Sequence, residues 1–284
     1  MSSSDGFALY HYVPSMPAAM VAAAVFGLSI GAHGWQIRRA RTWYMVPLVI
    51  SLFVEQIGYV VRIFSHRNNK DVIPYVTQLI AILIAPAFIA ASIYMILRRL
   101  IDMLQGEQYS LIPAKWLTKI FVSGDIFIVG LLSAGGGMMA SDDLRDTGER
   151  LIKAGLIVQL TWTGLFVVTT LIFHIRITRF PTPASTRHRA PMSWRTMLYV
   201  LYAANVLITV RTIFRLVQYI QGNDGTLVRR ELYLYIFDGV FIAIAVTLFN
   251  VFHPSRVLAK QMDDKEYNSS TSSDAETYQM SPGV

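Results

Sequence analysis

Long apolar runs dominate the chain and alternate with short polar connections. Seven of these runs reach the length of roughly 20 residues that a helix needs to cross a bilayer. They lie near residues 17–37, 43–64, 72–97, 116–139, 151–173, 194–220 and 231–252. None shows the two-residue alternation of a membrane β-strand. The pattern therefore predicts an all-α polytopic membrane protein with seven transmembrane helices.

Composition supports a membrane protein and excludes several other classes. Of 284 residues, 54% are apolar and only 15% are charged, and the mean hydropathy is +0.44. These values exclude a disordered chain and an ordinary soluble enzyme. The net charge is +7, but the positive residues lie in short loops, so the sequence does not indicate a nucleic-acid-binding protein. Without cysteines, disulfides and thiolate metal sites are excluded.

The distribution of Lys and Arg predicts the orientation. The connections on one side of the membrane, together with the C-terminal tail, hold 13 Lys and Arg residues, and those on the other side hold 6. Positive loops favour the cytosol, so we expect the N-terminus outside and the C-terminus in the cytosol. The predicted organisation is an extracellular tail over 1–16, a seven-helix domain over 17–254, and a cytosolic tail over 255–284. The last segment is rich in Ser and Thr, and we expect it to be disordered.

Ionisable residues inside the predicted spans are the main candidates for function. Each would cost about 2.5–3.5 kcal/mol at a helix centre if it faced lipid, so such residues face inward, form pairs or meet water. Several recur at helical spacing, which places them on common faces. The candidates from this pattern are Glu55, Tyr59 and Arg62 in span two, Gln78 in span three, Asp125 in span four, Gln159 in span five, Arg211 and Arg215 in span six, and Glu231, Tyr235 and Asp238 in span seven.

The candidate residues are predicted to lie at a similar depth in the membrane. With a rise of 1.5 Å per residue and alternating helix directions, the polar side chains fall between the middle of the membrane and its outer face. We expect a polar pocket there, open to the outside or to the outer leaflet. The alternative is a set of buried salt bridges that only fix helix register. Glu231, Asp238 and Glu55 would meet an amine, and the three arginines would compensate these carboxylates or bind an anionic group directly.

Signatures of enzymes and receptors are missing. The chain lacks H-E-x-x-H, G-x-S-x-G and a P-loop, so we expect no enzymatic activity and no metal site. Span seven contains no lysine, which excludes the usual retinal Schiff base there. His33 and His253 could ligate a haem iron, although nothing in their spacing requires a cofactor.

The order of motifs resembles the fungal RTA-like family of seven-span proteins, also called lipid-translocating exporters. The matching pieces cover residues 10 to 256 and are Tyr12 and Pro14, Glu55-Gln56-Ile57-Gly58-Tyr59 with Arg62, Tyr75 and Gln78, Ala85-Pro86, Ala90 and Tyr94, Phe121 and Asp125, Gly135-Gly136-Gly137, Gly155 with Gln159, Arg211, Phe214-Arg215, Gly222, Glu231, Tyr235, Phe237-Asp238 and His253-Pro254. The resemblance adds Tyr94 to the candidate binding residues. Gln218 departs from the family pattern, because a glutamate is common there.

The resemblance implies resistance to toxic amphiphiles, movement of sphingoid bases or sterol amines, or porphyrin uptake. The first hypothesis is therefore a transporter or translocase of amphiphilic lipids in the plasma membrane of a fungus. The second is a seven-span lipid sensor that binds the same ligands and signals through its tail. The third is a porphyrin- or haem-binding membrane protein. The expected partners are an amphiphilic or sterol-like ligand and the membrane, with no nucleic acid.

Overall fold

Seven long helices form the protein. The computed structural model describes residues 15–65, 72–187, 191–222, 225, 227 and 231–258. Seven helices in this part of the chain are long and apolar enough to cross a membrane, which confirms the predicted number of spans. They are α1 (Met16–Ala40), α2 (Val46–Ser65), α3 (Val72–Met103), α4 (Ala114–Met138), α5 (Arg145–Arg179), α7 (Trp194–Gln221) and a composite last helix.

The last helix has three parts. It begins as α9 (Glu231–Leu234), widens into a π-helix, η4 (Tyr235–Val240), and continues as α10 (Phe241–Val251). The shorter elements of the fold are η1 (Trp43–Met45), η2 (Glu107–Tyr109), η3 (Asp142–Leu144) and α6 (Pro183–Arg187).

Helix α5 differs most from the predicted limits. The apolar run covers 151–173, but α5 extends six residues further at each end. The first extension includes Glu149, which pairs with Lys153 at 2.8 Å, and the second carries Arg176 and Arg179 in the last turn. Polar turns outside the apolar run stay helical because such i, i+4 pairs and basic C-terminal residues stabilise helix ends.

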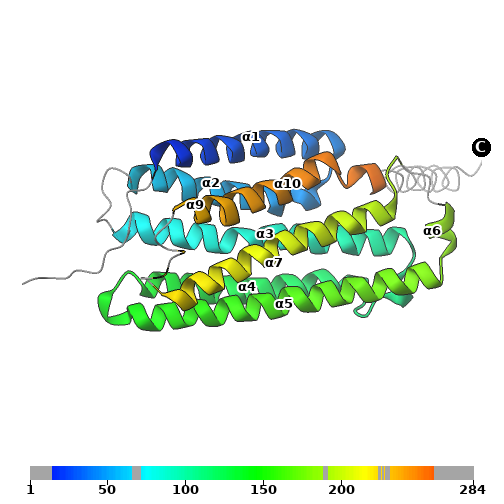
Figure 1. Cartoon of the computed structure of the whole chain (residues 1–284). Coiled ribbons are helices and arrows are strands. Elements are labelled where there is room, and N and C mark those ends of the chain that lie inside the picture. The colour runs from blue at the N-terminus through cyan, green and yellow to red at the C-terminus, as the bar shows by residue number, and fades with distance from the viewer. Residues whose placement is uncertain are drawn as a thin grey trace, which may run out of the picture.

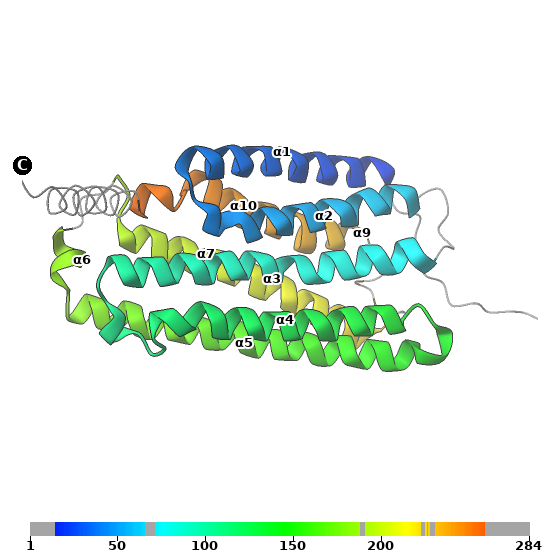
Figure 2. The same cartoon turned by 180° about the vertical axis from the view of Figure 1, so that it is seen from behind.

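Helix α3 is the central helix of the bundle. Figures 1 and 2 show α3 running between α2 and α4, with α1 on one outer side and α5 on the other, while α7 crosses it obliquely. In the most apolar stretch of α3, 78% of the residues are buried, whereas the corresponding share in α1 is 17%. Side chains on α3 can therefore contact helices on both sides of the bundle.

The outer surface carries large apolar side chains. Leu28, Ile73, Ile126 and Phe127 are each more than 60% exposed, and they come from three different helices. A soluble protein rarely exposes so much contiguous apolar surface. The protein is therefore an integral membrane protein, and these side chains face lipid.

The described part of the seven-helix domain begins and ends with helical residues. Helix α1 begins at Met16, and residues 255–258 are still helical, with Val257 and Leu258 buried in the bundle. The domain thus continues four residues beyond the predicted limit at 254. The remainder of each predicted tail, 1–14 and 259–284, lies outside the described residues.

Candidate functional site

The π-helix of the last span positions a buried carboxylate. Within η4, Asp238 is fully buried and is followed by Gly239. Single π turns inside α-helices are rare and occur frequently at functional sites. The spacing of apolar residues in the last span does not predict the π turn. The one available signal is Gly239, because a glycine often marks a position where another group lies close to the backbone.

Two arginines of α7 bind that carboxylate. Arg211 Nε lies 2.8 Å from Asp238 Oδ1, and Arg215 Nη2 lies 2.5 Å from Asp238 Oδ2. Arg215 also donates from Nη1 to Gln218 Oε1 at 3.2 Å. All three charged side chains are at most 6% exposed. The i, i+4 spacing on α7 therefore brings both guanidiniums to one buried carboxylate, and Gln218 extends the hydrogen-bonding row.

A proline on α3 supplies a further acceptor for Arg211. Pro86 has no N–H, so the carbonyl of Ile82, four residues earlier, lacks its usual partner within the helix. Arg211 donates from Nη2 to that carbonyl oxygen. The proline thus frees a backbone acceptor on the central helix, and a buried charge of α7 uses it.

A second ion pair lies one to two turns closer to the end of the bundle at which α1 begins. Arg62 Nη2 on α2 is 2.8 Å from Glu231 Oε1 on α9, and Arg62 Nε donates to the Tyr235 hydroxyl at 3.2 Å. The backbone N–H of Ser15 donates to both Glu231 oxygens at 2.8 and 3.0 Å. This contact joins the start of α1 to α2 and to the last helix.

Aromatic rings separate the two ion-pair groups. Tyr59 stacks between Phe26 of α1 and Tyr235, with ring centroids 5.5 and 5.9 Å apart. Its hydroxyl packs against Gly239, where a Cβ atom would come within 2.9 Å of the hydroxyl oxygen. Glycine is required at this position of η4 because it makes room for that hydroxyl.

Glu55 stands apart from the paired groups. It lies on α2 one turn before Tyr59, is 0% exposed, and faces the Arg211, Asp238 and Arg215 charges. Neither of its carboxylate oxygens has a hydrogen-bond partner among the described residues, and neither does Arg211 Nη1. A buried polar group without a partner costs about 1–3 kcal/mol.

We call the charged side chains of this region the ionic cluster. They are Glu55, Arg62, Arg211, Arg215, Glu231 and Asp238.

Two predicted residues form a separate group, which we call the Asp125 cluster. Tyr94 of α3 and Asp125 of α4 lie next to each other, and the Tyr94 ring packs on Phe121 and Phe166 at 5.2 and 4.5 Å. Trp162 completes the group, which consists of Tyr94, Phe121, Asp125, Trp162 and Phe166. Tyr94 is twelve residues along α3 from Ile82, a rise of about 18 Å. The structure therefore brings six of the twelve predicted residues together in the ionic cluster, with Tyr59 and Tyr235 packed between them, and places Tyr94 and Asp125 in another.

The two predicted glutamines are both buried. Gln78 lies on α3 one turn before Ile82, close to the level of the ionic cluster, and is 5% exposed. Gln159 lies on α5, one turn before Trp162, and its Oε1 atom has no hydrogen-bond partner among the described residues. Gln78 thus accompanies the ionic cluster, and Gln159 lies beside the Asp125 cluster.

His33 and His253 are buried near the opposite end of the bundle. His33 Nε2 lies 3.1 Å from the Val246 carbonyl oxygen, and His253 Nδ1 lies 2.8 Å from the Ser255 hydroxyl. The other ring nitrogen of each histidine has no partner in the described chain. Where the structure describes the chain, no three His, Asp or Glu side chains group as metal ligands would.

Comparisons with known proteins agree with this architecture. A model of the family described as RTA1 like protein matches residues 48–261. Protein RTA1 of Saccharomyces cerevisiae is 32% identical over 277 residues, which covers 89% of this chain and 86% of that protein. No solved structure matches the chain.

Two further relatives from the same yeast have descriptive names. Protoporphyrin uptake protein 1 is 31% identical over 290 residues, covering 88% of this chain and 94% of its own length. The sphingoid long-chain base transporter RSB1 is 25% identical over 276 residues, covering 85% and 72%. The family model and the first relative both extend over most of the chain. This protein therefore belongs to the RTA1-like family of membrane proteins.

Proposed function

We propose that the protein is a transporter or translocase of amphiphilic lipids that carry an amine, such as sphingoid bases and sterol amines, and that it thereby gives resistance to toxic lipids. The apolar part of the ligand lies between the helices, and its headgroup enters a hydrated pocket at the ionic cluster. The N-terminus is outside and the C-terminus cytosolic, so the cluster lies in the outer half of the plasma membrane.

Glu55 is the observation that carries this proposal. Its carboxylate is buried and lacks a hydrogen-bond partner in the described part of the chain. A ligand ammonium group supplies three donors and a positive charge, which is what a buried carboxylate needs. Tyr59 offers its hydroxyl to the headgroup, since that atom also lacks a partner among the described residues.

The arginines favour an amine over an anionic ligand. Arg62, Arg211 and Arg215 each already contact a carboxylate at 2.8 Å or less. Each arginine thus already has a direct carboxylate partner, with Asp238 shared by two of them, whereas the Glu55 carboxylate has no hydrogen-bond partner among the described residues. Glu231 is 16% exposed and lies at the outer rim, where it meets the incoming amine first.

The names of the relatives support the same class of ligand. One relative is named as a sphingoid long-chain base transporter, and another, from Emericella nidulans, as a probable lipid transporter. Sphingoid bases combine a long apolar chain with an amine, which matches a bundle that has an apolar surface and a buried carboxylate.

Reconstitution tests the proposal. Proteoliposomes containing the purified protein should move a fluorescent long-chain base across the bilayer, and Glu55→Gln should lower both its binding and its rate of movement at least tenfold. Glu149→Gln is the matched control, because it neutralises a carboxylate that pairs with Lys153 and lies outside the cluster. If the two variants behave alike, or if the wild-type protein neither binds nor moves the probe, the proposal is wrong.

The same assay separates a transporter from a sensor. A chain that ends after Leu258 keeps the complete bundle and should move the probe at the rate of the full-length protein. A sensor that acts through its tail would show ligand binding, no movement in either form, and loss of the cellular response on truncation.

Porphyrin or haem binding is the second candidate. Two observations favour it: the similarity to a protein named for protoporphyrin uptake, and two buried histidines that each present an unpartnered ring nitrogen in the described chain. Imidazole nitrogens are common axial ligands of haem iron. The purified protein titrated with haem should then show a Soret band that shifts in His33→Ala or His253→Ala but not in His174→Ala.

A further inference from the structure

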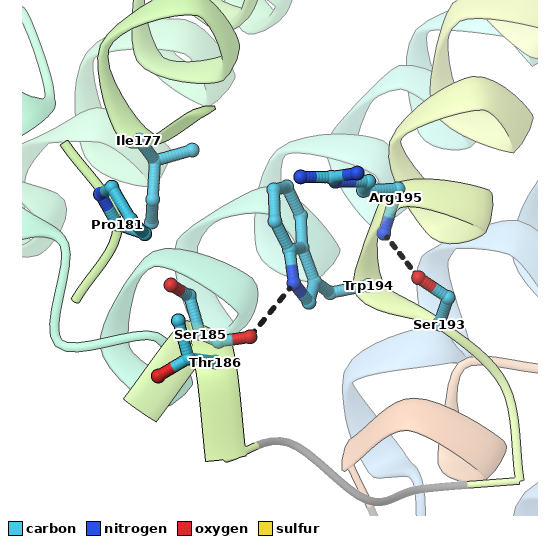
Figure 3. A pocket seen from close by; sticks show the side chains of 7 residues that line it. All are labelled: Ile177, Pro181, Ser185, Thr186, Ser193, Trp194 and Arg195. Atoms are coloured by element: carbon cyan, nitrogen blue, oxygen red, sulfur yellow. Dashed lines mark hydrogen bonds between the residues drawn. The ribbon is translucent and has the colours of Figure 1, made fainter. Parts of the chain in front are cut away.

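A pocket lies at the other end of the bundle, far from the ionic cluster. It has a volume of about 350 Å³ and is formed where α5 ends, α6 turns and α7 begins. Figure 3 shows the Trp194 ring facing Ile177 and Pro181 across the pocket, with Ser185 and Thr186 at one rim and Arg195 beside the ring. The seventh lining residue is Ser193.

The lining combines an apolar wall with anion-binding groups. Ile177, Pro181 and the buried Trp194 ring supply apolar surface. The guanidinium of Arg195 and the Ser193 hydroxyl, which accepts from the Arg195 N–H and keeps its own proton, supply hydrogen-bond donors, whereas the Ser185 and Thr186 hydroxyls already donate to the carbonyl oxygens of Thr182 and Pro183. Arg195 lies over the Trp194 ring at 5.2 Å from the centroid, which holds its charge at the pocket.

The pocket itself is firmly built. Trp194 Nε1 donates to the Ser185 carbonyl oxygen at 3.3 Å and so ties α7 to α6. Thr182, which precedes α6, donates from its hydroxyl to the Leu104 carbonyl oxygen at 2.6 Å and ties α6 to the end of α3. The α6 region is therefore tied to the start of α7 and to the end of α3.

The electrostatic surroundings are strongly positive. No Asp or Glu occurs anywhere from residue 150 to residue 223, which includes every lining residue. Arg176 and Arg179 are exposed in the last turn of α5, next to Ile177. The short helix η2, which carries Glu107, packs against α5, but Glu107 does not line the pocket. An anion is thus the complementary ligand.

The position along the membrane identifies the source of the anion. Helix α5 has 35 residues, about 52 Å of helix, and exceeds a hydrocarbon core of about 30 Å. Its last turn and the pocket therefore lie at the level of the lipid headgroups. A phosphate there, followed by the glycerol and the first acyl carbons, would meet the Arg195 guanidinium and the Ser193 hydroxyl first and the apolar wall next.

We propose that this pocket binds the phosphate of an anionic phospholipid in the leaflet at this end of the bundle. The site is separate from the ionic cluster and binds a ligand of opposite charge. It joins α5 and α7 through the lipid, because the lining residues come from the end of one helix and the start of the other.

Photocrosslinking locates such a lipid directly. The full-length protein is reconstituted in phosphatidylcholine with a trace of phosphatidic acid that carries a diazirine near its headgroup, and labelled peptides are mapped. We expect label on residues 177–195. Arg195→Gln should lower the yield about fivefold, the effect of removing one arginine at an anionic membrane surface.

Two variants show whether the pocket, rather than surface charge, is responsible. Arg39→Gln is the matched control, because Arg39 is exposed near the same end of the bundle and lies over Trp35 at 5.1 Å but does not line the pocket. It should retain the wild-type yield. Thr186→Trp keeps the charge and fills the pocket, and it should remove the label.

Three results would overturn the proposal. The first is equal labelling by a diazirine phosphatidylcholine, whose headgroup is zwitterionic. The second is an equal loss of label in Arg195→Gln and Arg39→Gln. The third is displacement of the lipid by inorganic phosphate, which would assign the pocket to a soluble anion instead.

Discussion

The two buried polar regions are held in opposite ways. In the ionic cluster, two carboxylates each contact at least one arginine at 2.8 Å or less, and the partners come from different helices. In the Asp125 cluster, a single carboxylate lies beside the Tyr94 hydroxyl among packed aromatic rings. Charge pairing across helices organises one region, and ring packing organises the other.

This difference indicates which of the candidate binding residues also contribute to the free energy of unfolding. Removing one partner of a buried ion pair leaves the other charge uncompensated, which is costly, whereas removing a lone carboxylate removes a cost. Substitutions at the ionic cluster should therefore destabilise the protein strongly, and Glu55 is the exception within it, because it has no direct partner in the described chain. Four experiments can break or sharpen this comparison.

The largest effect should come from Asp238→Asn. It would leave Arg211 and Arg215 buried beside a neutral amide, and we expect a loss of about 3–5 kcal/mol in the free energy of unfolding. The loss in the free energy of unfolding is measured by chemical denaturation in mixed micelles. The comparison fails if Asp238→Asn costs no more than the same substitution at Asp125.

Gly124→Ala tests ring packing in the other region. A Cβ atom at this position of α4 would overlap the Trp162 ring, so the ring must move, at a cost of about 1–3 kcal/mol. Gly130→Ala on the same helix is the control, because nothing lies within 4 Å of its Cβ position. Its thermal midpoint should equal or exceed that of the wild type.

A double-mutant cycle measures the outer ion pair. Arg62→Gln and Glu231→Gln, alone and combined, should give a coupling energy of about 1–2 kcal/mol, because the Arg62 side chain is only 1% exposed. The pair Arg98 and Asp102, which is 3.9 Å apart and about 40% exposed on both sides, is the matched control and should give nearly zero. Equal coupling in the two cycles would contradict a special role for the buried pair.

The smallest effect should come from Asp125→Asn. The amide has nearly the same shape, and no Lys or Arg of the described chain forms an ion pair with Asp125. We expect a change within about 1 kcal/mol in either direction, measured by the same unfolding experiment. A loss comparable with that of Asp238→Asn would show that Asp125 has a charged partner after all.

Most of the fold could be predicted from the apolar runs, and the candidate site only in part. All seven spans are found, because a segment of that length and hydropathy has few alternatives to a membrane helix. The i, i+4 and i+7 spacings correctly placed Glu55, Tyr59 and Arg62 on one face. The spacings carried no information on which carboxylate each arginine meets, or on the separation of Tyr94 and Asp125 from the rest.

Some features depended on contacts between distant residues. The π-helix at Asp238 leaves no periodic signal, and the link from Ser15 to Glu231 joins residues 216 positions apart. One contact had a signal that could have been used: Pro86 frees the carbonyl of Ile82, which predicts a donor from a neighbouring helix. The pocket at Trp194 depends on how α6 folds against α7, which hydropathy does not describe.

The amino-acid sequence by itself determined the number of crossings, their approximate limits and the need for inward-facing charges, because the cost of polar groups in lipid is set by each segment alone. Only the tertiary structure decided how those charges are paired, that Glu55 is left without a direct partner in the described chain, and that a pocket forms where α5 ends and α7 begins. Pairing depends on helix rotation and tilt, and these follow from the packing of all seven helices together.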